Sequence, residues 1–372
     1  MILAKKVRLY PSEIQEQKLW KSVNTARFIY NWTLARQEEN YKNGGKFISN
    51  NELRKEITQL KKNELSWLNE VSSNVAKQAV KDACNSYVNF FKGLSNKPKF
   101  KSKKRSRKSF YNDSCTLKVK EGKLVRIEKI GWIKTNEQLP VNVKYSNPRI
   151  SYDNKYWYLS VGIEQEEVKE ELTNVSLGID LGIKDLAICS DGTVYKNINK
   201  TYAVKKIEKR LKRLQRQVSR KYEMNRQGKK YIKTNNIIKL EKQIQLTYRR
   251  LANIRKNYLH QTTTSIVKTK PYRIVIEDLN VKGMMKNKYL SNTIGKQGFY
   301  EFRIQLEYKC KFKGIELIIA DRYYPSSKKC SNCENIKKDL KLSDRIYKCD
   351  KCGLDIDRDF NASLNLSNYK LV

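Results

Sequence analysis

Four cysteines near the C-terminus constrain the fold of this chain more than any other feature. Cys330 and Cys333 form one C-x₂-C pair, and Cys349 and Cys352 form a second pair after 15 intervening residues. Two such pairs at this separation are typical of a structural zinc site, in which a short segment folds around a tetrahedral ion. The sequence therefore predicts one structural Zn²⁺ bound by these four thiolates.

Acidic residues follow the second cysteine pair in a chain that is otherwise strongly basic. Asp357 and Asp359 stand just before an Asn-Ala-Ser run, whereas the whole chain has 78 Lys and Arg against 38 Asp and Glu, a formal charge of +40. Such a chain repels itself unless a polyanion neutralises it, so nucleic acid is the expected partner. Carboxylates held beside a zinc site in a nucleic-acid-binding chain indicate a metal-dependent nuclease.

Two other interpretations of the charge are a highly charged soluble surface and binding to an anionic membrane. Membrane binding is disfavoured because the basic segments alternate with predicted strands, helices and the zinc site. No apolar run approaches the roughly 20 residues that span a bilayer, and residues 1–6 lack the apolar core of a signal peptide. The remaining cysteines, expected to be buried apolar thiols, fit a reducing cytoplasm; they are Cys84, Cys115, Cys189 and Cys310.

The first half of the chain predicts a small helical bundle beside an all-β unit. Residues 2–10 predict a strand, and Ser12 with Gln15 forms a capping box that begins a helix ending near Gly44. Further helices are expected at about 50–62 and 73–92, and short strands fill 115–165. Residues 97–108 include eight basic and no acidic residues, which favours contact with phosphates over a solvated linker. Its candidate contacts are Lys97, Lys99, Lys103, Arg105 and Arg107.

Residues 201–260 predict a basic helical hairpin. The segment holds 19 Lys and Arg and three Glu, and its apolar residues recur at spacings of three and four, as in two paired amphipathic helices. An ordinary coiled-coil hairpin with solvated basic faces would show the same apolar pattern. The charge excess favours a hairpin that lies along a nucleic-acid backbone, with Arg210, Arg213, Arg216 and Arg220 as candidate contacts.

Three predicted strands end in or carry acidic residues. Residues 175–183 alternate strictly, so Asp180 shares a strand face with Gly178 and Gly182. We interpret these glycines as room for a metal ion and a phosphate backbone. A second strand, 272–276, is followed by Glu277 and Asp278, and a third, 315–320, by Asp321. Carboxylates at strand ends are also common as solvated caps, so neither of these is specific alone.

The ordered set of motifs resembles the TnpB family, transposon-encoded RNA-guided nucleases related to the type V CRISPR effectors. The resemblance rests on residues 178–182 (Gly-Ile-Asp-Leu-Gly), 276–280 (Ile-Glu-Asp-Leu-Asn), the four cysteines and 357–362 (Asp-Arg-Asp-Phe-Asn-Ala), which are similar to three split RuvC motifs and a zinc knot. Residues 8–11, 30–31, 89–93 and 326–333 also resemble family segments. One departure is Glu334, where the family commonly has Gly, so the first knuckle is expected to differ slightly in shape.

The resemblance implies an active site and its cofactor. By this likeness the catalytic carboxylates are Asp180, Glu277 and Asp359. Asp357 either supports these ligands from just outside the site or is structural, and Asp278 and Asp321 are solvated or capping. Three carboxylates at one site repel one another without cations, and hard oxygen ligands suit Mg²⁺ or Mn²⁺. Two ions about 4 Å apart would then support hydrolysis of a phosphodiester bond.

The resemblance also implies a fold and partners. We expect an α/β RNase H-like (RuvC) nuclease domain at 171–372, with the hairpin 201–260 and a zinc ribbon at 326–356. An N-terminal β-barrel-like domain at 1–12 and 96–170 would be interrupted by a helical domain at 13–95. The expected partners are a guide RNA and target double-stranded DNA, since no helix-turn-helix is evident. The alternatives are a non-cleaving RNA-guided repressor, disfavoured because all three carboxylates are present, and a transposase that joins strands.

Overall fold

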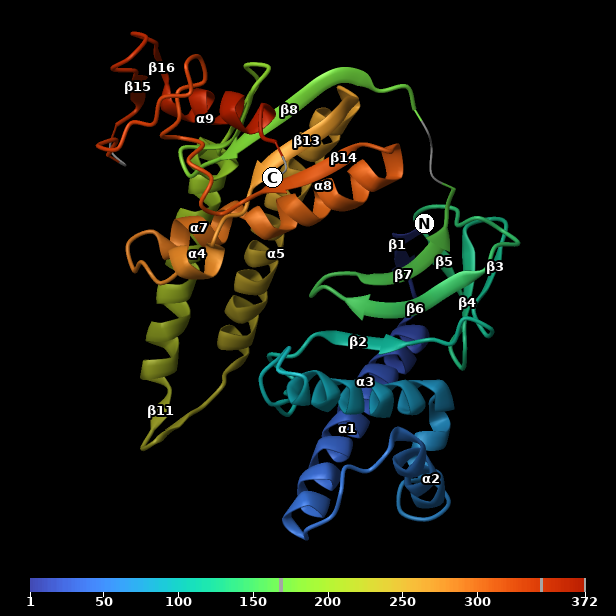
Figure 1. Ribbon diagram of the computed structural model, residues 1–372. Helices are drawn as coiled ribbons and strands as arrows, with labels where there is room; N and C mark the ends of the chain where they lie inside the picture. Colours follow the sequence, from blue (N-terminus) through green and yellow to red (C-terminus); the bar gives the residue numbers. More distant parts are fainter. Residues whose placement is uncertain (167–169, 342–343, 371–372) are drawn as a thin grey trace. The chain divides into compact units, whose positions relative to one another are not determined.

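The structure is a computed structural model that describes residues 1–166, 170–341 and 344–370. The chain divides into two compact units, Met1–Gln165 and Glu166–Val372, shown with their helices and strands in Figure 1. Within the described ranges, no helix has the length and apolar content needed to cross a bilayer.

Unit 1 contains one seven-stranded antiparallel sheet in the order β2-β6-β7-β1-β5-β4-β3. Its longest pairing joins β1 to β7, from Ile2 opposite Glu164 to Leu9 opposite Trp157. Inward-facing aliphatic side chains of β1, β4, β5, β6 and β7 form the main core of this unit. The strands are β1 (Ile2–Tyr10), β2 (Lys108–Tyr111), β3 (Lys118–Lys120), β4 (Leu124–Ile127), β5 (Gly131–Thr135), β6 (Tyr145–Tyr152) and β7 (Trp157–Glu164).

A helical bundle is inserted between β1 and β2. It comprises α1 (Glu13–Lys42), α2 (Asn50–Leu60), a 3₁₀ turn (Ser66–Glu70) and α3 (Ser73–Phe91). The predicted capping box is confirmed, because the Ser12 hydroxyl accepts from the Gln15 N–H and the Gln15 side chain accepts from the Ser12 N–H. The expected β-barrel-like arrangement takes the form of a single sheet with β2 and β3 at its edges.

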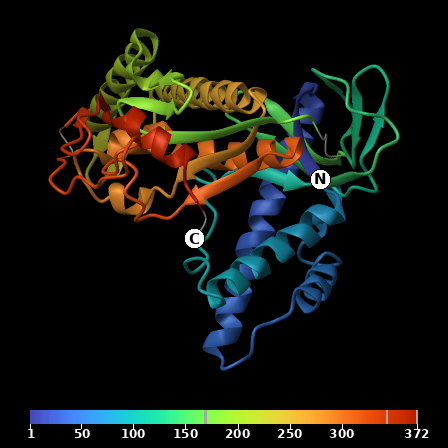
Figure 2. The same ribbon diagram turned by 45° about the horizontal axis from the view of Figure 1, so that its top comes forward.

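Unit 2 is built on a five-stranded mixed sheet in the order β10-β9-β8-β13-β14. The three strands β8, β13 and β14 are parallel, and β9 and β10 continue the sheet in antiparallel fashion. Helices α5 and α8 pack on one face, and the last helix, α9, packs on the other; Figure 2 shows α5 running along the sheet. The strands are β8 (Thr173–Leu181), β9 (Asp185–Cys189), β10 (Val194–Lys196), β13 (Pro271–Glu277) and β14 (Glu316–Ala320).

The predicted hairpin is present and longer than expected. Helices α4 (Tyr202–Met224) and α5 (Asn235–Lys268) are joined by the short paired strands β11 (Arg226–Gln227) and β12 (Lys230–Tyr231). The apolar stripe packs between the helices through Val204, Leu211 and Leu251. The rest of unit 2 consists of α6 (Val281–Met284), α7 (Ser291–Gln297), α8 (Phe299–Lys313), β15 (Ile346–Lys348), β16 (Asp355–Asp357) and α9 (Arg358–Ser367).

One expectation about the scattered cysteines is wrong. Cys84, Cys189 and Cys310 are buried as predicted, but Cys115 is exposed. It lies in a turn between β2 and β3, where its N–H donates to the Asp113 carboxylate at 2.8 Å. Cys115 therefore belongs to a surface turn and not to a strand that faces a core.

Candidate active site and zinc centre

The four predicted zinc ligands come together. Their sulfur atoms all lie within 4.8 Å of one another, with 3.6 Å between Cys330 and Cys352 and 3.5 Å between Cys333 and Cys349. These separations are far longer than a disulfide bond. They match the roughly 3.8 Å between sulfurs that a tetrahedral ion at about 2.3 Å from each would require. The donor set and its spacing therefore fit a structural Zn²⁺.

The two cysteine knuckles close with the same hydrogen bonds. Cys330 N–H donates to the Asn335 carbonyl at 2.8 Å, and Cys349 N–H donates to the Leu354 carbonyl at 2.9 Å. The expected difference in shape at the first knuckle is not found in these bonds, because Glu334 itself adopts a left-handed φ of 62°, close to the 71° of Gly353 in the second knuckle. An ion pair between the Lys329 ammonium and the Glu334 carboxylate, at 2.9 Å, accompanies this conformation.

Two buried asparagines of α9 bind the first knuckle directly. The Asn361 side chain accepts from the Ser331 N–H at 3.0 Å and donates to the Lys329 carbonyl at 2.7 Å. The Asn365 amide donates to the carbonyls of Ser326 and Lys329 at 2.8 and 2.6 Å. Both side chains are buried, so the knuckle and α9 are held together by bonds that water cannot replace.

Asp180 lies near the end of β8, where helix α9 crosses the strand. Added to Gly178, a Cβ atom would come within 2.0 Å of the Ser363 carbonyl oxygen and 2.3 Å of the Ser367 nitrogen. Gly178 is therefore required for close contact with α9, and our interpretation of it as space for metal and phosphate is wrong. A Cβ at Gly182 would meet the Asp185 carbonyl at 3.1 Å, which indicates a tight turn rather than open space.

Sheet register places Glu277 beside Asp180. Ile276 of β13 pairs with Ile179 of β8, so the next residue on each strand is one of these two carboxylates. Burial, and then the negative charges of Glu277 and Asp359, raise the pKa of the Asp180 carboxyl well above its ordinary value. Burial also raises the pKa of Glu277 to about 7, with the charge of Asp359 adding to the effect and a backbone hydrogen bond at Leu181 opposing it. The three carboxylates thus share one electrostatic environment.

Asp359 faces two arginines as well as the other carboxylates. One of its carboxylate oxygens accepts from two nitrogens of Arg358, at 3.2 and 3.0 Å, and the other lies 3.8 Å from Arg345. In the described part of the chain, the four cysteines are the one group of three or more ligand-type side chains whose ligand atoms all lie within 4.8 Å. The carboxylates are therefore neighbours that do not converge as closely as the thiols.

The other acidic residues have structural partners. The Asp357 carboxylate caps α9 by accepting from the N–H groups of Asp359 and Phe360, each at 3.0 Å. Asp278 is not merely solvated, because it accepts from Arg303 at 3.4 Å and pairs with Arg322. Asp321 accepts from the Tyr323 N–H at 2.7 Å and caps a turn, as expected.

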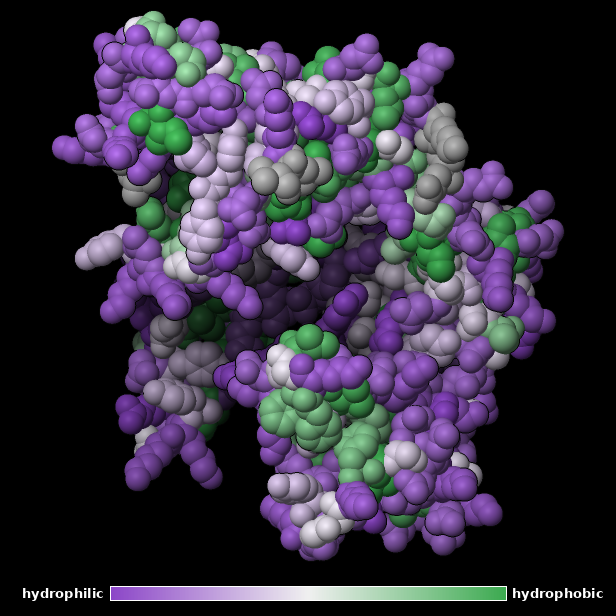
Figure 3. All heavy atoms as spheres, in the orientation of Figure 1, coloured by the Kyte–Doolittle hydropathy of each residue, from purple (hydrophilic) through white to green (hydrophobic). Residues whose placement is uncertain are grey.

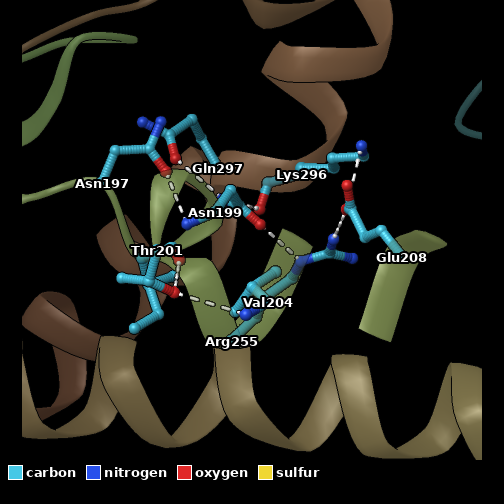
Figure 4. Close-up of polar contacts among 9 residues, drawn as sticks. Asn197, Asn199, Thr201, Val204, Glu208, Arg255, Lys296 and Gln297 are labelled. Atoms are coloured by element: carbon cyan, nitrogen blue, oxygen red, sulfur yellow. Dashed lines mark hydrogen bonds and ion pairs between the residues drawn. The ribbon is translucent and has the colours of Figure 1, made fainter. Parts of the chain in front are cut away.

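A polar network joins the base of the hairpin to α7 (Figure 4), and through Gln297 it reaches the residue that follows the strand carrying Asp180. The Asn199 side chain accepts from Arg255 of α5 at 2.7 Å and donates to Gln297 of α7 at 3.2 Å. Gln297 in turn donates to the Gly182 carbonyl at 2.8 Å, two residues beyond Asp180. On the other side, Glu208 of α4 pairs with both Arg255 and Lys296. The hairpin is thus fixed to the candidate active site at its base.

The predicted nucleic-acid contacts are exposed. Lys97, Lys99, Lys103, Arg105 and Arg107 lie in the segment between α3 and β2, and Arg210, Arg213, Arg216 and Arg220 lie on α4. Arg216 and Arg220 line a shallow hollow of about 650 Å³ together with Lys212, Gln215 and Ser219. Arg210 and Arg213 do not line it, so the structure separates the four predicted arginines into two pairs.

Sequence reasoning missed Asn361, Asn365 and Gln297 as structural links of the site. Asn361 and Asn365 are spaced by four on one helix, a pattern that places both side chains on the same face. This spacing could be read from the sequence. The groups that the two side chains bind could not, because they are backbone atoms of a distant loop and any residue type has them. Gln297 carried no comparable signal.

Comparison with known proteins supplies the family. A family model described as "Probable transposase", OrfB_IS605, matches residues 158–288, and one described as "Cas12f1-like, TNB domain" matches 299–366. The Escherichia coli (strain K12) protein named "Putative RNA-guided DNA endonuclease InsQ" is 31% identical across 97% of this chain and 90% of its own length. The chain belongs to the TnpB/OrfB_IS605 family. The resemblance noted from the motifs is therefore confirmed.

Other relatives of this TnpB-family protein agree. A Streptomyces pristinaespiralis protein named "Putative RNA-guided DNA endonuclease" is 30% identical over 97% of this chain and 87% of its own length. The solved structure titled "Cryo-EM structure of the Cas12f1-sgRNA-target DNA complex" covers 95% of this chain and 82% of its own, with a TM-score of 0.57 at 16% identity. The solved structure titled "Structure of the mini-RNA-guided endonuclease CRISPR-Cas_phi3" has a TM-score of 0.55 at 11% identity, and the match covers 99% of this chain and 92% of its own. These two likenesses show a shared fold.

One further family model, described as "Helix-turn-helix domain", matches residues 1–46. In the structure this segment contains the strand β1 and the single 30-residue helix α1. The described residues of this segment therefore form one strand and one long helix, although the matching family model is described as a helix-turn-helix domain.

Proposed function

We propose that this TnpB-family protein is an RNA-guided DNA endonuclease encoded by a mobile element. The observation that carries the proposal is the similarity to InsQ across 97% of the chain, in a chain that retains all three carboxylates of the motifs. Two of these carboxylates are adjacent at the ends of parallel strands, and the third lies at the start of the helix packed on them. The strong positive charge supports nucleic acid as both guide and substrate.

The topology of unit 2 supports assignment to the RNase H-like (RuvC) class. Its strand order, β10-β9-β8-β13-β14, places the first strand of the unit at the centre, followed outward by two parallel strands on one side. We propose the boundaries 171–372 for this nuclease domain, with the zinc ribbon at 326–356. The part of the chain before it would then comprise a β domain at 1–12 and 96–170 and a helical domain at 13–95 that together grip the guide RNA.

The carboxylate cluster fits Mg²⁺ or Mn²⁺. Its donors are hard oxygens, and burial together with the neighbouring carboxylate charges raises the pKa of both Asp180 and Glu277, an environment that a bound cation would relieve. Asp180, Glu277 and Asp359 would hold the ions. When bound, such ions activate water and stabilise the leaving 3′ oxygen at phosphorus.

The residues of the chain set up this site before substrate arrives. Buried strands β8 and β13 fix Asp180 and Glu277, so little reorganisation is needed during reaction. Asp357 caps α9 and so places Asp359 in its first turn, where the Arg358 guanidinium pairs with the Asp359 carboxylate. The zinc knuckle, bound by Asn361 and Asn365, fixes the position of the whole helix.

The test is Mg²⁺-dependent cleavage by carboxylate variants of the RNA-bound protein. Asp180→Ala and Glu277→Ala should each lower cleavage by at least about 100-fold, a loss typical of removing one transition-state contact. DNA binding should persist, because it depends mainly on cations. Asp321→Ala, which removes an acidic residue at the end of the neighbouring strand β14, is the control and should remain active.

The same assay separates the alternatives. Guided binding without cleavage by the wild-type protein would support a repressor. Joining of the cut strand to a second DNA, in place of hydrolysis, would support a transposase. Full activity of Asp180→Ala would contradict the assigned site.

A further inference from the structure

Large apolar side chains gather on the surface at the C-terminal end of α3. Phe91 is 64% exposed, Leu94 75%, Phe47 42% and Phe90 37%. Figure 3 shows a hydrophobic patch over this end of α3, surrounded by hydrophilic side chains. We call Phe47, Phe90, Phe91 and Leu94 the aromatic patch. Exposed apolar groups that are contiguous, rather than scattered, mark interaction sites.

The rings of the patch hold one another in place. The Phe91 ring is stacked on Tyr87 with 6.0 Å between centroids and 24° between planes, and it meets Phe47 edge to face at 5.8 Å. Phe90 lies 5.6 Å from Phe91. Tyr87 is anchored below, in a buried cluster with Tyr30 and Leu34 of α1. Phe91 is thus an exposed ring on a fixed base, the property of a stacking surface.

Cations border the patch in space as well as in sequence. The backbone of Lys101 is clamped to α1 by Asn31, which donates to the Lys101 carbonyl at 2.9 Å and accepts from its N–H at 2.7 Å. The Lys101 ammonium lies 3.5 Å from the centroid of Tyr30, the ring that packs with Tyr87. Lys97 pairs with Glu38 of the same helix at 3.1 Å. The basic segment that follows α3 therefore runs along α1 next to the aromatic patch.

We infer that the aromatic patch stacks unpaired bases of the bound RNA while the adjacent basic segment 97–108 contacts its phosphates. Aromatic rings beside a cationic track are the combination that binds single-stranded nucleic acid, because every base has a face that can stack. The inference extends the proposed function, which supplies RNA as the partner. RNA is favoured over target DNA as the occupant because a bound guide would cover the patch at all times, also between cleavage events. Target DNA would leave the patch uncovered, and an uncovered apolar patch promotes aggregation.

Charge argues against two other occupants. A second copy of this chain would bring a further formal charge of +40 to a border that is already basic, and the repulsion would oppose association. A protein partner would need an acidic rim to match the eight cations of residues 97–108. RNA supplies the matching charge on its own backbone, with bases free to reach the rings.

The test is binding of an unstructured single-stranded RNA to full-length protein freed of its copurified RNA. Phe91→Leu keeps apolar volume and removes the ring, so affinity should fall roughly tenfold, the value of one base stack. Phe91→Trp should retain affinity. The slope of affinity against salt should stay unchanged in both, because no phosphate contact is lost. Trp67→Leu is the matched control, since Trp67 has the same exposure as Phe47, 42%, but no ring contact with the patch.

Binding to an abasic RNA shows whether Phe91 contacts the bases or the backbone of the RNA. On an RNA of the same length without bases, Phe91→Leu and the wild type should bind equally. An equal loss on both RNAs, or no loss on either, overturns the inference. So does a change in oligomeric state caused by Phe91→Leu, which would assign the patch to a second copy.

Crosslinking decides between RNA and DNA. In the guide-bound protein with target DNA added, Trp at position 91 in the Phe91→Trp variant should crosslink under ultraviolet light to RNA; a crosslink to DNA alone overturns the assignment. Failure of the proposed function would look different, because wild-type protein would then carry no RNA or fail to cleave whatever the residue at position 91.

Discussion

At the scale of single residues, the candidate site depends on two aspartates that lie two positions apart and do different work. Asp357 accepts two backbone N–H bonds and begins α9. Asp359, one residue inside the helix, contributes charge to Asp180 and Glu277 and pairs with Arg358. The charge of Asp357 also reaches Asp180, but as the weakest of the contributions to its raised pKa. The position of Asp359 relative to Asp180 and Glu277 therefore favours Asp359 over Asp357 as the metal ligand.

This difference gives the first prediction. Asp359→Ala should abolish Mg²⁺-dependent cleavage while RNA and DNA binding persist. Asp357→Ala should lower the free energy of unfolding by about 1 kcal/mol through loss of the helix cap, and should keep substantial activity. Thermal unfolding and cleavage measured on both variants check it. Inactive Asp357→Ala beside active Asp359→Ala would move the catalytic assignment two residues upstream.

The same scale shows what the sequence could and could not predict. Strict alternation located Asp180 on a strand, and the position of Glu277 followed from a second apolar run. Gly178 was noticed for its lack of a side chain, but the reason was the backbone of α9, nearly 190 residues away, which no local pattern reveals. Glu334 adopts a left-handed φ despite its Cβ, because the hydrogen bonds that close the knuckle determine its backbone more strongly than its own preference.

At the scale of elements, the zinc ribbon and α9 form one unit. Hydrogen bonds from Asn361 and Asn365 join the first knuckle to the helix, and β16 leads directly into its cap. We propose that a zinc ion held by the four cysteines would stabilise the position of Asp359 without taking part in the chemistry.

A second prediction follows for zinc. The protein should contain one zinc per chain, and chelation or Cys349→Ser should reduce both cleavage and the hydrogen-exchange protection of residues 358–367. Asn361→Ala, which leaves the buried Ser331 N–H without its partner and removes one of the two amide donors to the Lys329 carbonyl, should cause the same loss of protection at a cost of about 2 kcal/mol. Asn368→Ala, at the exposed C-cap of the same helix, is the control. If the hydrogen-exchange protection of α9 were unchanged in zinc-free protein, the helix would not depend on the zinc ribbon.

The elements differ in how far the sequence could predict them. Helices α1–α5 were predictable because capping residues and apolar repeats are local signals, as Ser12 and the stripe through Val204 and Leu211 show. The sheet of unit 1 was predictable only as a set of strands. Its order pairs β1 with β7 and β5, and such pairing depends on contacts across more than 100 residues.

A third prediction concerns the hairpin. Arg216→Gln with Arg220→Gln should weaken nucleic-acid binding and reduce the slope of log affinity against log salt by about 0.7–0.9 per lost phosphate contact. The matched pair Arg210→Gln with Arg213→Gln, on the same helix but outside the hollow, should have a smaller effect. Affinity measured over a salt series distinguishes them. An unaltered slope in both double variants would mean that the hairpin serves only as a scaffold.

At the scale of the whole molecule, the excess of cations is spread over both units. Residues 97–108 supply it in unit 1 and residues 201–260 in unit 2, with a local charge of +16 in the second. Contacts of this kind bind any phosphate backbone and carry little sequence information. Specificity for one DNA site must then come from elsewhere, and in the proposed function base pairing with a bound RNA would provide it.

The most direct test of this account is cleavage of a plasmid by purified protein treated with RNase and then given one of two different guide RNAs. Without RNA, the protein should make no cut at a defined site. Each guide should restore Mg²⁺-dependent cutting at its own matching sequence, and exchanging the guides should exchange the cut positions. Site-defined cutting that stays at one position whichever guide is supplied would contradict the account.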